Sequence, residues 1–107
     1  MAAIINPTTF TITDALITAQ GVTSFLVKFS QTSGGPYTLT ATVPTADINA
    51  SAGTVTGTLA SLNTTLAPGN WFAVSEAVNA AGDSTNSPEA AFTIEAVPSA
   101  PTAFSVA

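Results

Sequence analysis

The 107-residue chain contains no cysteine and no histidine, and its only basic residue is Lys28. Without cysteine there is no disulfide framework, and without cysteine or histidine neither a Ser-His nor a Cys-His nucleophilic pair can form. One lysine cannot neutralise a nucleic-acid backbone, and it cannot hold a chain on an anionic membrane surface. The sequence therefore predicts that neither nucleic acid nor a membrane is a partner.

Long apolar runs are also missing. No stretch of the sequence approaches the length of a membrane span. Residues 1–7 have neither the basic region nor the apolar region of a signal peptide. If Met1 is the native start, we expect a protein that is not exported by the usual secretory route. If Met1 was added to an excised fragment, this expectation does not apply.

The acidic residues are few and scattered, and they give the chain a net charge of −5. They form neither the carboxylate pair of a glycosidase nor the oxygen cluster of a calcium site. We interpret them as solvated surface acids, and we predict no catalytic residue, no metal ligand and no cofactor. For Lys28 we expect a solvent-exposed cross-strand ion pair with Glu76, which would contribute less than ~1 kcal/mol to stability. A surface rich in Thr, Ser and Asn is typical of modules outside the cell or on virus particles.

Apolar and polar residues alternate with a period of two along most of the chain. The clearest examples are residues 9–13, 25–30, 37–43, 54–59 and 92–95. Successive side chains of a strand point to opposite faces, so each of these segments has one face to bury and one face for water. The pattern indicates β-strands rather than helices.

Glycine- and proline-containing turn signals separate these runs. We expect seven strands, near residues 8–13, 15–20, 24–31, 36–43, 54–62, 70–79 and 88–96. This number of short strands predicts an all-β fold, a seven-stranded antiparallel β-sandwich that spans residues 1–97. The expected core residues are Phe10, Ile12, Val27, Phe29, Leu39, Leu59, Leu66, Val74, Phe92 and Ile94.

Three segments resemble fibronectin type III domains, especially bacterial ones. Residues 25–37, Phe-Leu-Val-Lys-Phe-Ser-Gln-Thr-Ser-Gly-Gly-Pro-Tyr, resemble strand C, the turn after it and the start of strand C′. Residues 66–70, Leu-Ala-Pro-Gly-Asn, resemble the turn before strand F, and residues 77–84 resemble the end of strand F and the F–G loop. The resemblance covers roughly residues 16–97. It implies a fibronectin type III or immunoglobulin-like sandwich that is a structural or binding module rather than an enzyme.

The chain departs from this family at two aromatic positions. The family usually has a Trp on strand B, which is absent here, and a Tyr shortly after the Pro-Gly turn. Counting from Pro68 places Phe72 in the tyrosine position, whereas counting back from Asn79 places Trp71 there. A β-bulge would reconcile the two alignments. Trp71 either fills the core or, if exposed, offers a surface contact for a sugar ring or a protein partner.

The C-terminal residues 98–107 form a proline-containing linker and a strand-like tail. Residues 101–106, Pro-Thr-Ala-Phe-Ser-Val, repeat residues 7–12, Pro-Thr-Thr-Phe-Thr-Ile, almost position for position. An unpaired alternating strand can add to the exposed edge of another sheet. We therefore expect Thr102, Phe104 and Val106 to be partner-binding residues on a neighbouring copy. The alternatives are a disordered tail, a strand folded back on its own domain, and the first strand of a following domain.

Three functions are compatible with these features. The first is a virion protein, such as a phage capsid decoration or tail accessory protein, which assembles with copies of itself or with a capsid or tail protein. The second is an extracellular spacer or adhesion module of a larger secreted enzyme or cell-surface protein. The third is a carbohydrate-binding module that uses Trp71 to bind glycans. We expect the virion surface as the location in the first case.

Overall fold

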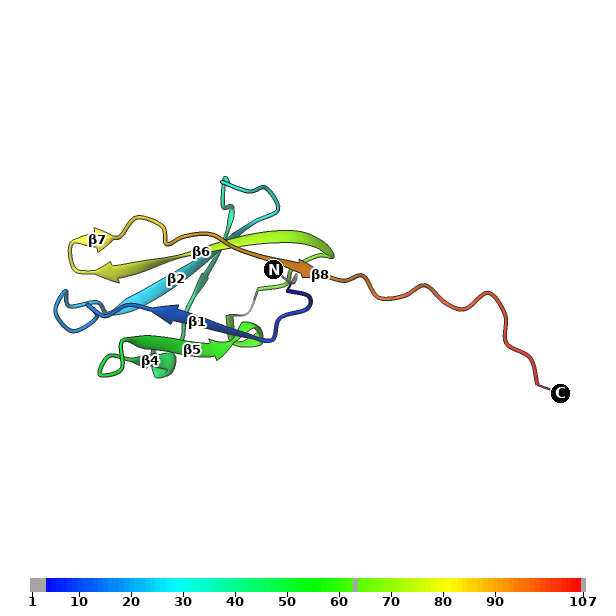
Figure 1. Cartoon of the computed structure of the whole chain (residues 1–107), viewed down its shortest axis with the longest axis horizontal. Coiled ribbons are helices and arrows are strands. Elements are labelled where there is room, and N and C mark those ends of the chain that lie inside the picture. The colour runs from blue at the N-terminus through cyan, green and yellow to red at the C-terminus, as the bar shows by residue number, and fades with distance from the viewer. Residues whose placement is uncertain (1–3, 63, 107) are drawn as a thin grey trace.

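The computed structural model describes residues 4–62 and 64–106, which form two antiparallel sheets that pack face to face in a sandwich-like arrangement (Figure 1). The smaller sheet has the strand order β1 (Thr9–Thr13), β5 (Thr54–Thr58) and β4 (Ile48–Asn49). The larger sheet has the order β3 (Leu39–Thr42), β2 (Ser24–Ser30) and β6 (Gly69–Asn79), with β7 (Gly82–Asp83) and β8 (Ala90–Ile94) both paired to β6. Short 3₁₀ turns cover Thr45–Asp47 and Leu59–Leu62. The prediction of an all-β fold is confirmed.

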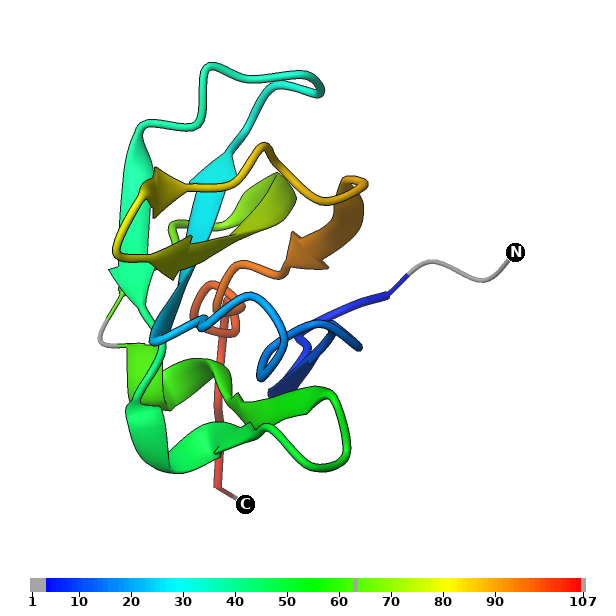
Figure 2. The same cartoon turned by 90° about the vertical axis from the view of Figure 1, so that its left-hand side faces the viewer.

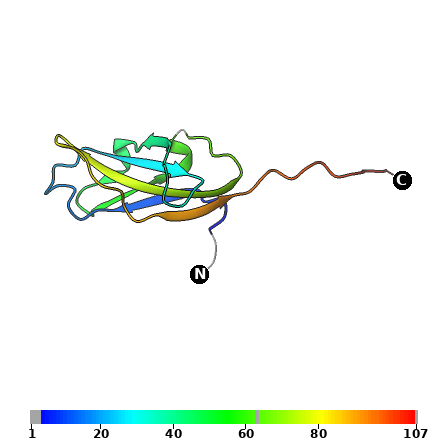
Figure 3. The same cartoon turned by 90° about the horizontal axis from the view of Figure 1, so that it is seen from above.

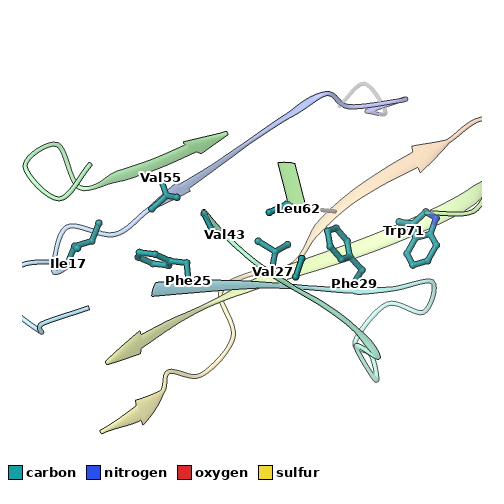
Figure 4. Packing of buried hydrophobic residues seen from close by; sticks show 9 residues of the cluster. Ile17, Phe25, Val27, Phe29, Val43, Val55, Leu62 and Trp71 are labelled. Atoms are coloured by element: carbon teal, nitrogen blue, oxygen red, sulfur yellow. The ribbon is translucent and has the colours of Figure 1, made fainter. Parts of the chain in front are cut away.

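The core lies between the two sheets and follows the period-two pattern. The inward-facing side chains of β2 are Phe25, Val27 and Phe29, and all three are buried. They meet residues from the smaller sheet and its loops in one cluster that also contains Ile17, Ala41, Val43, Val55, Leu62 and Trp71 (Figure 4). Most of the other expected core residues pack against this cluster and are partly buried: Phe10, Ile12, Leu39, Leu59, Leu66, Phe92 and Ile94.

Val74 is buried as expected, but on the opposite face of the larger sheet. It lies opposite Lys28 in the β2–β6 register, whereas the core residue Phe29 lies opposite Ala73. Cross-strand partners share a face, so Val74 belongs to the outer face together with Lys28 and Glu76.

The predicted strand at residues 15–20 is wrong, because this segment forms turns that connect β1 to β2. The Asp14 Oδ1 atom accepts a hydrogen bond from the backbone N–H of Leu16 at 3.0 Å, and the N–H of Gln20 donates to the carbonyl of Leu16 at 2.9 Å. The side chain of Ile17 alone points into the core. The predicted strand at 54–62 is also too long, since Leu59–Leu62 winds into a 3₁₀ turn.

The N-terminal residues 4–6 contact the larger sheet before the chain crosses to β1 in the smaller one. Ile5 forms a parallel bridge with Thr93 of β8. The N–H of Asn6 donates to the carbonyl of Thr93 at 2.8 Å, and the N–H of Thr93 donates to the carbonyl of Ile4 at 2.9 Å. As a result β1 and β8 lie on the same side of the molecule but in different sheets (Figure 2).

Between β7 and β8 the edge of the larger sheet is irregular. The hydroxyl oxygens of Ser84 and Ser87 accept hydrogen bonds from the backbone N–H groups of Ala77 and Ser75, at 2.8 and 2.9 Å. The N–H groups of the same two serines donate to the carbonyls of Ala77 and Ser75, both at 2.8 Å. The serine side chains therefore complete the pairing of β6 where a regular strand is interrupted.

Beyond β8 the chain runs away from both sheets as an extended tail (Figure 3). Residues 95–106 are exposed and belong to no strand. The molecule is consequently elongated, with principal extents of 68 × 27 × 27 Å.

Candidate functional site

The tail holds two large apolar side chains in solvent. Phe104 is 90% exposed and Val106 is 84% exposed, and Thr102 is exposed beside them. The tail contacts none of the strands, so the described part of the chain does not show it folded back on its own domain. Residues 96–106 also carry no charge. The predicted partner-binding residues thus lie together on a free, uncharged segment.

Strand β1 presents an unpaired edge to solvent. The N–H of Leu59 donates to the carbonyl of Thr8 and the N–H of Asp14 donates to the carbonyl of Gly53, both at 2.9 Å. In an antiparallel pair the hydrogen-bonded positions alternate, so Phe10 and Ile12 direct their backbone groups toward β5. The N–H and C=O groups of Thr9, Thr11 and Thr13 point the other way, where no strand of the described residues pairs with them.

A groove runs beside this edge, between β1 and β6, and we call it the seam. One hollow of about 110 Å³ is lined by Phe10, Ile12 and Val27, by residues 73–75 of β6 and by Ser87. A second hollow, of about 240 Å³, continues from it and shares Ile12, Ser75 and Ser87 with the first. Phe10 and Ile12 are only partly buried, so the seam exposes part of the core.

Trp71 lies in the core and not on the surface. The residue is 8% exposed, and its Nε1–H group donates to the carbonyl of Ala67 at 2.7 Å. Figure 4 shows the indole beyond Phe29, at the end of the row of core side chains. Phe72, its neighbour, is on the outer face opposite Ser30. Of the two roles that the sequence leaves open for Trp71, the surface contact requires an exposed ring, and an indole buried in this way cannot stack on a sugar ring.

The expected ion pair between Lys28 and Glu76 is present, with Nζ and Oε2 3.1 Å apart. The two side chains meet diagonally, since Leu26 is the residue opposite Glu76. The pair is less exposed than expected, because the Glu76 side chain is 10% exposed and that of Lys28 is 27% exposed. The second carboxylate oxygen of Glu76 is buried and has no hydrogen-bond partner among the described residues.

Glu89 joins two loops that lie far apart in the sequence. Its carboxylate accepts hydrogen bonds from the Ser33 hydroxyl and from the backbone N–H of Gly34, both at 2.7 Å, and from the Tyr37 hydroxyl. The hydrogen bond from Tyr37, followed by those from Gly34 and Ser33, lowers the pKa of Glu89 below its usual 4.5. The hydrogen bond to Glu89 raises the pKa of Tyr37 above its usual 10.0.

These shifts predict that the link from Glu89 to the 33–37 loop stabilises the fold only between two pH limits. The lowered pKa of Glu89 makes its contribution complete above about pH 4.5, and it is lost as the pH falls through the folded-state pKa. The raised pKa of Tyr37 makes the contribution complete below about pH 10.0, and it is lost as the pH rises through the folded-state value. Thermal unfolding of the wild type and of Glu89→Gln should therefore differ most near neutral pH and converge toward both limits.

Asp83→Asn is the matched control for this pH series, because Asp83 is an exposed acid like Glu89 but lies in the short strand β7, away from the 33–37 loop. We expect its midpoint to follow that of the wild type at every pH. A difference between wild type and Glu89→Gln that is constant from acid to neutral pH would contradict the role assigned to the carboxylate.

Within residues 4–62 and 64–106 the side chains that could ligate a metal are dispersed. Among them there is no group of three or more His, Cys, Asp or Glu residues that could hold a metal ion. A hollow of about 400 Å³ at the β6–β7 end is lined by residues that include Gln20, Ala77 and Gly82, and Asp83 is the one titratable side chain among them. Within residues 4–62 and 64–106 no helix is long and apolar enough to cross a membrane.

Comparison with known proteins identifies no relative of this chain. No protein-family model matches the sequence, and neither the curated proteins nor the solved structures contain a match.

Proposed function

We propose that the chain is a non-catalytic immunoglobulin-like module of the fibronectin type III kind, which assembles with other protein chains through its C-terminal tail. The sheet orders support the fold assignment. The order β3-β2-β6-β8 corresponds to strands C′, C, F and G, and the order β1-β5-β4 corresponds to B, E and D of such a sandwich. In this assignment β1 is strand B, and it is preceded by residues 4–6, which are bonded to β8.

Trp71 supports the same assignment. In immunoglobulin-like domains a conserved Tyr near the start of strand F donates its hydroxyl to a backbone group a few residues upstream. The Trp71 Nε1–H makes the equivalent bond to Ala67, in the turn that precedes β6. Trp71, and not Phe72, therefore occupies the tyrosine position of the resembled family.

The observation that carries the assembly proposal is the exposure of Phe104 and Val106 on an alternating, uncharged segment. Apolar side chains of this size are unfavourable in water, and burying one contributes about 1.5–3 kcal/mol. An extended segment can bury them by joining the edge of another sheet, where its backbone groups also find partners.

A virion surface is the setting that we propose for this assembly, with the chain as a capsid decoration or tail accessory protein. The low content of charged residues and the abundance of Thr support it. A copy of the chain, or a capsid or tail protein, would be the partner.

A second setting is supported by the linker itself. Residues 97–101 read Val-Pro-Ser-Ala-Pro and precede a repeat of the β1 sequence. Prolines favour an extended backbone, which suits a spacer between consecutive domains. In that setting the tail is the first strand of a following domain in a secreted or cell-surface protein.

The test is the solution mass of the chain, measured by light scattering over a range of concentrations. We expect the full chain to associate and a chain truncated after Val97 to remain monomeric. The double variant Phe104→Ser/Val106→Ser is the matched control for chain length, and it should also be monomeric. If the full chain is a monomer at every concentration, self-assembly through the tail is excluded and the spacer function becomes the better proposal.

A further inference from the structure

We propose that the tail of one copy docks as an added strand along the free edge of β1 on a second copy, with Phe104 and Val106 in the seam. This inference rests on the proposed function, in which the tail mediates assembly, and it names the acceptor site. The acceptor consists of the outward backbone groups of Thr9, Thr11 and Thr13 and of the apolar groove beside them.

The topology leaves room for a strand at this position. Within the described residues the order B-E-D has no strand A, which in an immunoglobulin-like sheet pairs with strand B. Here β1 takes the place of B, and residues 4–6 are bonded to β8 in the other sheet instead of to β1. An added strand beside β1 would extend the smaller sheet and cover Phe10 and Ile12.

The hydrogen bonds direct the incoming backbone to β1 and not to β6. Across the seam, Ser84 and Ser87 already satisfy the backbone groups of Ala77 and Ser75. The free donors and acceptors along the seam are therefore those of Thr9, Thr11 and Thr13. An unpaired edge of this kind is a template for another strand.

The alternating side chains of the tail place its two large apolar residues on one face, which matches the apolar lining of the seam. Phe104 and Val106 stand where β1 has Phe10 and Ile12, so they share one face, while Ala103 and Ser105 share the other. Neighbouring strands place like faces together, which puts Phe104 and Val106 beside the partly buried Phe10 and Ile12. The face formed by the small side chains of Ala103 and Ser105 would continue the threonine surface of β1.

Two other positions are less suitable. Among the described residues the outer edge of β3 is also unpaired, but β3 lines neither hollow of the seam and neither of the hollows at the β6–β7 and β6–β8 ends. The place beside β5 is occupied, because β1 pairs with β5 from Thr9 to Thr13. Docking beside β1 also leaves each copy with its own free tail, so the contact repeats head to tail and builds a ring or a filament.

Disulfide cross-linking can locate the docked tail, since the chain has no cysteine of its own. One chain carries Ser105→Cys and a size tag. A second chain carries Thr9→Cys, Thr11→Cys or Thr13→Cys, so that position 105 is tested opposite each of the three outward-facing residues of β1. Adjacent strands hold facing Cα atoms about 4.5–5.5 Å apart, within the range that a disulfide spans. The mixed chains are oxidised in a glutathione buffer and separated on a non-reducing gel, where the heterodimer has its own size.

Two matched cysteine positions make the result specific. Thr56→Cys lies opposite Thr11 on the same face, but one strand further from the proposed tail position. Thr40→Cys is an exposed position on another sheet edge, that of β3. We expect a heterodimer with at least one of the three β1 positions. It should be at least tenfold more abundant than the heterodimer with Thr56→Cys or Thr40→Cys. It should be lost when Phe104→Ser/Val106→Ser is added to the Ser105→Cys chain.

Each of the other outcomes overturns the inference, but they differ in whether the proposed function still stands. Cross-linking at Thr56 would show that the tail displaces β1, and cross-linking at Thr40 would place it on β3; in both cases tail-mediated assembly stands and the acceptor site is wrong. The same holds if light scattering shows tail-dependent association and none of the positions cross-links. If the full chain neither associates nor cross-links, the proposed self-assembly and the acceptor site both fail.

Discussion

Replacing Trp71 with alanine is expected to lower the free energy of unfolding by about 3–5 kcal/mol, the usual cost of removing a large buried aromatic ring. The ring is buried at the end of the core, and its Nε1–H bond fixes the turn that leads into β6. Alanine would leave a cavity between the sheets and release the carbonyl of Ala67. Urea unfolding followed by circular dichroism measures the change, because the variant has no tryptophan to report fluorescence.

Two further variants separate packing from hydrogen bonding. Trp71→Phe keeps a ring but loses the donor, and we expect a smaller loss that includes about 1 kcal/mol for the hydrogen bond. Phe72→Ala removes a neighbouring aromatic ring on the outer face, where it is only partly buried, and should cost less than Trp71→Ala. An equal or larger loss for Phe72→Ala would contradict the assignment of Trp71 to the core.

The stability of Trp71→Ala also bears on function. A tryptophan that binds glycans from the surface can be removed with little effect on folding, whereas a core tryptophan cannot. The sequence left both roles open because the number of residues between Pro68 and Asn79 fits either Trp71 or Phe72. The register of β6 decides which of the two aromatic residues faces the core. That register depends on the pairing with β8, where Trp71 lies opposite Phe92.

The alternation of apolar and polar residues predicted most of the strands, because a strand with one buried face needs an apolar side chain at every second position. Residues 15–20 were predicted incorrectly because a short run with Leu16 and Ile17 is compatible with a strand or with one helical turn. Asp14 was the available signal, since its side chain accepts the N–H of Leu16 and starts a turn. Gly21, with φ of 62°, then allows the chain to leave the turn.

The tail and the open edge of β1 differ in how far the sequence could reveal them. The repeat of residues 7–12 in residues 101–106 is a sequence feature, and it predicted an unpaired strand with Phe104 and Val106 on one face. The open edge of β1 was not predictable, because it depends on residues 4–6 bonding to β8 rather than to β1. The contact of Glu89 with Tyr37 was not predictable either, because it also joins segments far apart in the sequence: the two residues are 52 positions apart.

Removing Lys28 alone is expected to destabilise the fold by about 1–3 kcal/mol, the cost of leaving a buried charged group without its partner. The reason is the environment of Glu76, whose side chain is 10% exposed and whose second carboxylate oxygen already lacks a hydrogen-bond partner. An exposed pair, as the sequence alone suggested, would cost under ~1 kcal/mol. Lys28→Met keeps the length and the apolar part of the side chain, so the measured loss reports mainly the charge.

The double variant Lys28→Met/Glu76→Leu should recover most of that loss, because replacing both members of a buried ion pair by apolar residues is often neutral or stabilising. Both side chains lie on the outer face beside the buried Val74, which gives the new apolar groups a surface to pack against. Urea unfolding of the wild type, the two single variants and the double variant completes the thermodynamic cycle. Additive losses in the double variant would show that Lys28 and Glu76 act independently, and that the 3.1 Å contact contributes nothing to stability.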